Sequence, residues 1–257
     1  GDGLSIGAGQ FDHRIRIATG DELERLASRV NEMAAELAVS RERSERIGRL
    51  KRFLSPQVAE LVESAGKEDL LGAQKADVVV VFCDLRGFTA FSEVAEPEEV
   101  MGVLGAYHAA AGRLVERYEA TLERFAGDGI MLFFNDPLPC PNPAERAVRL
   151  AVDLQAAMAG LDEVWRQRGH KLGFGVGIAL GFATMGRVGF DSRGDYAAVG
   201  PVVNQASRLC DLAKAGEILV SQRVLSQAEG LARAVALGEM SPDGRRQTVS
   251  AHRISGR

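Results

Sequence analysis

The sequence lacks an apolar run long enough to cross a membrane. Its longest run, Val78 to Cys83, is far shorter than the roughly 20 residues that a spanning helix needs. Residues 1–9 contain neither a basic segment nor an apolar one, so we expect no signal peptide. Membrane attachment is therefore expected only through a segment absent from this chain.

Cysteine is scarce, and no sign of charge dominates. Cys83, Cys140 and Cys210 are an odd number at wide spacings without a Cys-x-x-Cys pair, which argues against a disulfide framework and a zinc site and predicts a reducing, cytoplasmic location. The 31 basic and 35 acidic residues sum to −4, so no basic field favours a nucleic-acid partner.

The composition is that of a globular protein. Apolar residues make up 46% of the chain and charged residues 26%. At about 150 residues per domain, 257 residues predict one large domain plus something smaller.

Residues 20–54 predict a long amphipathic helix. Thr19 and Glu22 have the spacing of a capping box. One narrow stripe, typical of a coiled-coil seam, is formed by Leu23, Leu26, Val30, Met33 and Leu37. Beyond Ser44 two successive steps of three interrupt the heptad, as in a stammer. The helix either lies on the main domain or pairs with a second copy, and the narrow stripe favours pairing.

The remaining sequence predicts an α+β domain. Residues 77–84 read as a buried strand and 98–118 as a helix. A Gly-Asp-Gly turn joins two strands of a hairpin, 121–126 and 130–134. Further along, we expect a helix at 144–168 and a strand at 171–182, followed by a glycine-rich charged stretch at 186–200. A helix at 201–212 and a short strand at 217–221 are expected after it. This order is the split βαβ, ferredoxin-like fold, an antiparallel-rich sheet with helices on one face.

Two aspartates hold suggestive positions in this fold. Asp84 ends the first strand, and Asp128 lies at the tip of the hairpin beside it. Paired carboxylates suit Mg²⁺ or Mn²⁺ and a two-metal phosphoryl transfer. The turn Arg86–Thr89 leads into a helix start, where free amides favour phosphate oxygens. Taken singly, Asp84 is better explained as a helix cap and Asp128 as a turn residue, but the two together favour the metal site.

Three blocks of this region resemble the signatures of the class III adenylate/guanylate cyclases. They are FCDLRGFTAFS at 82–92, RFAGDGIMLFF at 124–134 and DYAAVGPVVNQASRL at 195–209. Residues 7–37 resemble the connector and second helix of a HAMP domain, a signal-relaying module. The two resemblances imply a partial HAMP domain at 1–40, a signalling helix and linker at 41–76, and a catalytic domain at 77–257.

The cyclase resemblance assigns roles residue by residue. Asp84, Asp128 and the backbone carbonyl of Leu85 would hold two Mg²⁺ or Mn²⁺ ions. Asn204 would orient the ribose, and Arg208 would stabilise charge on the α-phosphate. The turn residues Gly87, Phe88 and Thr89 would contact the substrate. The family builds each site from both chains of a homodimer, with the metal aspartates from one chain and the Asn and Arg from the other.

The base-reading positions depart from the family pattern. Arg124 stands where adenylate cyclases have lysine, and Ala197 where they have Asp or Thr. Arginine can donate to adenine N1 but also to guanine O6 and N7. Guanylate cyclases place Glu at the Arg124 position, and a guanidinium cannot accept the guanine N1 proton. Glu123 is expected to face the other side of its strand. The balance favours ATP over GTP.

The lysine that binds the terminal phosphates is also replaced. Residues 242–246 align with its position, where Asp243 takes its place and Arg245 or Arg246 are the substitutes. The sequence therefore predicts an adenylate cyclase within the cytoplasmic part of a membrane-anchored bacterial receptor. The alternatives are a guanylate cyclase and a degenerate domain that binds nucleotide or dimerises without turnover. A diguanylate cyclase is disfavoured because the hairpin turn has no GG(D/E)EF motif.

The other tempting residues receive structural interpretations. His13, His108, His170 and His252 have no ligand spacing, and Trp165 is expected to pack in the core. Cys83 should point into the core because its neighbour Asp84 faces the other side of the strand.

Overall fold

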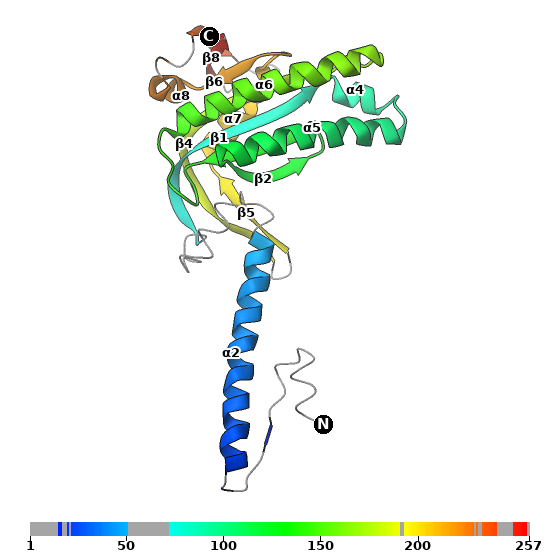
Figure 1. The fold of residues 1–257 in the computed structure, drawn as a ribbon. Coiled ribbons are helices and arrows are strands. Elements are labelled where there is room, and N and C mark those ends of the chain that lie inside the picture. The colour runs from blue at the N-terminus through cyan, green and yellow to red at the C-terminus, as the bar shows by residue number, and fades with distance from the viewer. Residues whose placement is uncertain are drawn as a thin grey trace. The chain divides into compact units, whose positions relative to one another are not determined.

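The computed structural model describes residues 15–16, 20, 22–50, 72–190, 193–228, 230, 233–240 and 249–255 (Figure 1). The chain divides into two compact units, Gly1–Arg52 and Phe53–Arg257. Among the described helices, none combines the length and apolar character that a membrane span requires.

The first unit contains one long helix, α2 (Glu22–Leu50), which confirms a helix in this region. The predicted continuation to residue 54, and Thr19 of the predicted capping box, lie outside the described residues. Two residues of the apolar stripe are largely exposed to solvent: Leu26 is 59% exposed and Met33 is 51% exposed. Asn31 ties the preceding segment to the helix, since its side chain exchanges two 2.8 Å hydrogen bonds with the backbone of Ile15.

The second unit is an α+β domain built on one sheet (Figure 1). Its elements are β1 (Gln74–Arg86), α4 (Phe88–Ser92), α5 (Pro97–Tyr118), β2 (Thr121–Ala126), β3 (Gly129–Phe134), α6 (Pro143–Gln167), β4 (Gly173–Phe190), β5 (Arg193–Val199), α7 (Pro201–Leu212), β6 (Ile218–Val220), α8 (Gln222–Gln227), β7 (Arg233–Met240) and β8 (Val249–Ser255). The strand order is β2-β3-β1-β4-β6-β8-β7, and β5 pairs with β4.

The first four strands in this order confirm the ferredoxin-like prediction. The three adjacent pairs β2–β3, β3–β1 and β1–β4 are all antiparallel, as the split βαβ order requires. α5 and α6 cross one face of the sheet. Side chains at alternate positions of β1, including Val81, Cys83 and Leu85, enter the core beneath these helices. Cys83 is 1% exposed and Trp165 4%, so both are core residues, as predicted.

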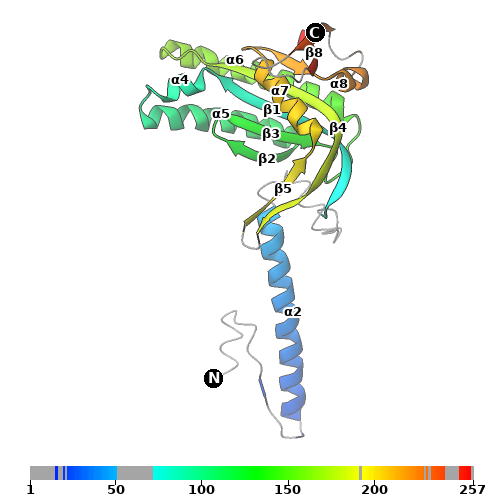
Figure 2. The ribbon, with the colours of Figure 1, turned by 180° about the vertical axis from the view of Figure 1, so that it is seen from behind.

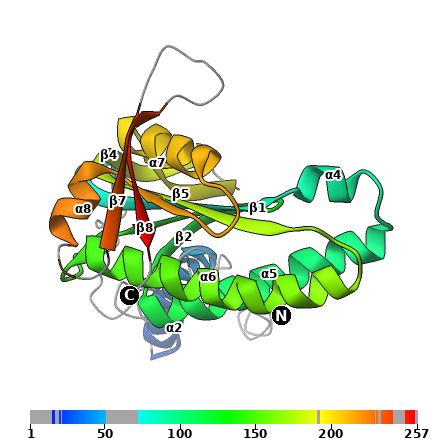
Figure 3. The same ribbon diagram turned by 90° about the horizontal axis from the view of Figure 1, so that it is seen from above.

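Two expectations about the rest of the domain were wrong. The stretch at 186–200 is mostly strand, because β4 continues to Phe190 and β5 returns alongside it from Arg193. Helices also lie on both faces of the sheet, since α7 packs opposite α5 and α6 (Figure 3). Figure 1 views the domain from the side of α5 and α6, and Figure 2 from the side of α7.

A glycine lets α7 approach the sheet. Gly177 of β4 points away from the α5–α6 core, because its neighbours Val176 and Ile178 point into that core. A Cβ atom at Gly177 would lie 2.1 Å from the backbone nitrogen of Cys210, so only glycine permits this contact. The close packing fixes α7, which carries Asn204 and Arg208, against the centre of the sheet.

Candidate active site

Asp84 lies on the sheet face opposite α5 and α6. Its neighbours Cys83 and Leu85 point into the core, so the strand alternation directs the Asp84 carboxylate to the other face. Its side chain is 34% exposed. Asp128 occupies the turn that joins β2 to β3, and β3 pairs with β1, so the register brings the turn beside Asp84.

The two carboxyl groups interact electrostatically. The pKa of Asp84 is raised to about 6. Burial is the largest cause, followed by the charge of Asp128, while the nearby Arg86 guanidinium opposes the rise. Two carboxylates this close cannot both ionise without cost, and a cation between them removes that cost.

Arg86 was predicted only as part of the turn, yet it lies two residues beyond Asp84 on the same strand. Its Nη1 donates to Asp84 Oδ2 at 2.7 Å, and its Nε donates to the carbonyl of Ala213 at 2.9 Å. Its Nη2 donates to the carbonyl of Cys210. The guanidinium therefore links the candidate metal ligand to the end of α7. Strand alternation, which places i and i+2 on one face, was the available signal.

The site fits a divalent cation. Mg²⁺ and Mn²⁺ are commonly held by one or two carboxylates together with substrate phosphates. Asp84 and Asp128 supply hard oxygens, and the negative charge of Asp128 contributes, after burial, to the raised pKa of Asp84. The Leu85 side chain has no donor atom and lies in the core, so only its backbone carbonyl can contribute. Among the described residues no group of three potential side-chain ligands gathers anywhere, so phosphates would have to complete the coordination.

The turn after Asp84 is shaped by the backbone. Gly87 has a φ of 80° and caps the five-residue helix α4. A Cβ atom at Gly87 would lie 2.8 Å from the carbonyl oxygen of Lys171, so glycine is required. Phe88 is buried, and Thr89 accepts a hydrogen bond from Ser92 through its carbonyl. Contact of Gly87, Phe88 and Thr89 with a substrate stays a prediction.

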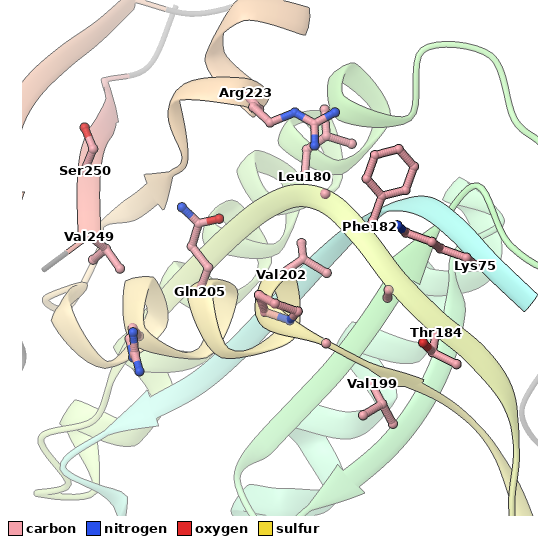
Figure 4. A pocket seen from close by; sticks show the side chains of 15 residues that line it. Lys75, Leu180, Phe182, Thr184, Val199, Val202, Gln205, Arg223, Val249 and Ser250 are labelled. Carbon is pink, nitrogen blue, oxygen red and sulfur yellow. The ribbon is translucent and has the colours of Figure 1, made fainter. Parts of the chain in front are cut away.

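Asn204 and Arg208 stand one helical turn apart on α7. Asn204 is exposed and Arg208 is half-buried. Arg208 is among the residues that line a cavity of about 680 Å³ between α7 and β4 (Figure 4). In the same cavity, Phe182 lies between Lys75 and Arg223, whose cationic groups are 4.9 and 6.0 Å from the ring centre.

The base-reading strand contains a β-bulge that the sequence did not reveal. The register of β2 shifts between Leu122, which faces Leu132, and Arg124, which faces Met131. Glu123 is the extra residue, and its Oε1 lies 3.4 Å from Nη2 of Arg124. The prediction that Glu123 faces the opposite side from Arg124 was therefore wrong. Ala197 is half-buried on β5, which contacts β2.

His108, which was given a structural interpretation because it lacks ligand spacing, supports the hairpin. Its Nε2 lies 3.0 Å from the carbonyl oxygen of Gly127, next to Asp128. Its ring packs on Phe125 with a centroid distance of 4.3 Å. Sequence spacing gave no signal, since α5 and the hairpin tip are brought together only by the fold. The phosphate-lysine segment at 242–246 lies outside the described residues.

Sequence comparisons place these elements in a known context. A model of the "Adenylate and Guanylate cyclase catalytic domain" family matches residues 72–256, and a HAMP domain model matches residues 4–38. An adenylate cyclase of Anabaena cylindrica is 32% identical over 231 residues, which cover 86% of this chain and 45% of the relative. Adenylate cyclase 1 of Rhizobium meliloti is 29% identical, over 72% of this chain and 28% of the relative. The chain thus spans less than half the length of these relatives.

Solved structures agree with this result. The adenylyl cyclase CyaB from P. aeruginosa is 32% identical with a TM-score of 0.68, over 73% of this chain and 97% of that one. The guanylyl cyclase Cya2 is 29% identical with a TM-score of 0.66, over 72% and 94%. Because the family model matches most of the chain and its sheet carries the paired aspartates, this protein belongs to the adenylate and guanylate cyclase catalytic domain family.

Proposed function

We propose that this chain is an adenylate cyclase, which converts ATP to 3′,5′-cyclic AMP and pyrophosphate. The placement of Asp84 beside Asp128, at the end of β1 and in the turn of the adjacent β2–β3 hairpin, carries the proposal, because neighbouring carboxylates suit divalent cations. Relatives named adenylate cyclase support the choice of ATP.

The chemistry requires the ribose 3′-oxygen to attack the α-phosphorus. Divalent cations, Mg²⁺ or Mn²⁺ with two ions per site, supply positive charge that lowers the pKa of the 3′-hydroxyl and neutralises the triphosphate. Asp84, Asp128 and the Leu85 carbonyl are the groups that hold them. Gly87, Phe88 and Thr89 form the turn beside the phosphates.

Two side chains of α7 complete the reaction site. The Asn204 amide orients the ribose, and the Arg208 guanidinium stabilises negative charge that develops on the α-phosphate. Loss of one such preorganised donor typically costs about 3 kcal/mol of transition-state stabilisation. The cyclase family works as dimers, and we propose that α7 of one protomer serves the aspartates of the other, giving two shared sites.

The residues proposed to recognise the purine lie on β2 and β5. Arg124 donates to adenine N1, and Ala197 contributes only a small apolar surface beside the base. A guanidinium is also a good partner for guanine O6 and N7, which keeps GTP as the alternative substrate. The resemblance to the guanylyl cyclase Cya2 supports testing it.

The domain organisation is proposed from the same resemblances. Residues 1–40 form a partial HAMP domain, residues 41–76 a signalling helix and linker, and residues 77–257 the catalytic domain. A HAMP domain is a module of signalling receptors, and the named relatives are more than twice as long as the matched segment. We propose that the chain is the cytoplasmic part of a membrane-anchored bacterial receptor.

A product assay tests the proposal. Purified protein is incubated with Mn²⁺ and either ATP or GTP, and the products are identified by mass. Cyclic AMP from ATP is the expected result. Cyclic GMP without cyclic AMP would replace ATP by GTP as the substrate, and nucleotide binding without either product would indicate a degenerate domain.

A further inference from the structure

The β-bulge in β2 changes which side chains reach the substrate face. Thr121 pairs with Phe133 of β3, and Leu122 pairs with Leu132. Of these two β3 residues, only Leu132 belongs to the core beneath α5 and α6. Strict alternation would therefore turn Glu123 to the face opposite α5 and α6, and Arg124 to the core. The extra residue restarts the alternation, so Arg124 pairs with Met131 and also lies on the face opposite α5 and α6.

The face opposite α5 and α6 is the one that carries the candidate metal site. Met131 pairs with Phe82 on β1, and Phe82 lies two residues before Asp84, so all three share a face with Arg124. Directly opposite residues of antiparallel strands point to the same side of the sheet. The bulge thus gathers a carboxylate and a guanidinium on the same side as the Asp84 carboxylate.

The two side chains of the bulge have very different surroundings. The Arg124 side chain is 61% exposed, while that of Glu123 is 4% exposed. Glu123 Oε1 lies 3.4 Å from Arg124 Nη2. A buried side chain holds a fixed position, so Glu123 can restrain the more exposed Arg124 side chain through this ion pair.

We propose that Glu123 is a positioning residue for purine recognition, acting by holding the Arg124 guanidinium on the sheet face that carries Asp84. The proposal rests on the proposed function, which places the purine at Arg124. An unrestrained arginine side chain must lose its rotamer freedom when a ligand binds, and a restrained one has lost part of it already. Since Ala197 offers no polar side chain, recognition depends more heavily on where Arg124 is held.

The neutral, nearly isosteric variant Glu123→Gln removes the charge that holds Arg124. We expect the KM for ATP to rise roughly three- to tenfold, the range for ordering one long side chain on binding. The kcat should stay within about twofold, because Asp84, Asp128 and Arg208 are unchanged. Glu119→Gln is the matched control: it breaks the 2.7 Å pair with Arg146 and should leave KM unchanged.

A double-mutant cycle separates positioning from other roles. In an Arg124→Ala background, Glu123→Gln should cause no further rise in KM, because the side chain through which Glu123 acts is gone. An equal rise in both backgrounds would overturn the proposal in favour of direct contact between Glu123 and the base. Thermal unfolding of each variant is measured in parallel. A lower Tm with an unchanged KM would also overturn it, as the result of a purely structural residue.

A binding measurement keeps this test independent of turnover. The affinity for 3′-deoxy-ATP, which lacks the attacking hydroxyl, is measured with Mn²⁺ present for wild type and variants. Suppose that the wild-type protein makes no cyclic nucleotide, but that Glu123→Gln binds 3′-deoxy-ATP three- to tenfold more weakly than wild type. This result would contradict the proposed function and support the positioning role. Equal affinities for wild type and Glu123→Gln would refute the positioning role whatever the protein's activity.

Discussion

Replacing Asp84 by asparagine should stabilise the metal-free protein while it abolishes activity. The folded state raises the pKa of Asp84 from 3.8 to about 6, chiefly by burial and then by the charge of Asp128. Between these two values the folded protein binds more protons than the unfolded chain, so stability falls as the pH rises through that window. An asparagine side chain carries no charge, so the variant would avoid this penalty at neutral pH.

The magnitude follows from the size of the shift. About two pKa units at roughly 1.4 kcal/mol each give a limit of about 3 kcal/mol. The Asp84 side chain is 34% exposed, and solvent screening reduces this limit to about 1–2 kcal/mol. At roughly 2–4 °C per kcal/mol for a domain of this size, the Tm should rise by about 2–8 °C.

Thermal unfolding in EDTA at pH 7.5 and pH 5 measures the effect. Asp84→Asn should unfold at a higher temperature than wild type at pH 7.5, and the gap should shrink at pH 5, where wild-type Asp84 is mostly protonated. Mn²⁺ should raise the Tm of wild type but not of the variant. Asp162→Asn, in an exposed pair with Arg166, is the control and should show no gain. A less stable Asp84→Asn protein at pH 7.5 would refute the reasoning.

Three further predictions concern the metal, the hairpin and the upstream helix. Mn²⁺ should support more cyclase activity than Mg²⁺, because the altered phosphate-binding segment favours an ion with less strict geometry; higher initial rates with Mg²⁺ would contradict this. His108→Phe keeps a ring on Phe125 but loses the contact with the Gly127 carbonyl, so the Mn²⁺ concentration for half-maximal activity should rise severalfold, and an unchanged Mn²⁺ titration would rule out a supporting role. Seven residues inserted near Ser44 should preserve activity and regulation better than three or four, since seven restore the seam; equal activity in all three would make α2 a passive tether.

Much of the catalytic unit was predictable because its patterns are local. The alternation around Val81, the Gly-Asp-Gly turn and the Pro201 helix start each specify an element from neighbouring residues alone. The glycine-rich stretch before Gly200 was misjudged because its pairing with β4 is a long-range property. Glycine is uncommon in strands, but a partner strand can still supply the backbone hydrogen bonds.

The site was predictable in its residue types but not in its supports. Asp84 and Asp128 were identified from their positions at strand ends. Arg86 could have been found from strand alternation, since it shares a face with Asp84. His108 and the bulge at Glu123 could not, because one depends on the packing of α5 on the hairpin and the other on a register shift that no residue pattern announces.

Complementation between two inactive variants tests the shared-site cyclase most directly. Asp84→Ala and Arg208→Ala should each abolish activity, because every site of either homodimer lacks one essential group. When the two are mixed and allowed to exchange subunits, about half of the dimers are mixed, and each has one intact site, so activity should recover to roughly a quarter of wild type. A mixture as inactive as its components, with exchange confirmed, would contradict the account.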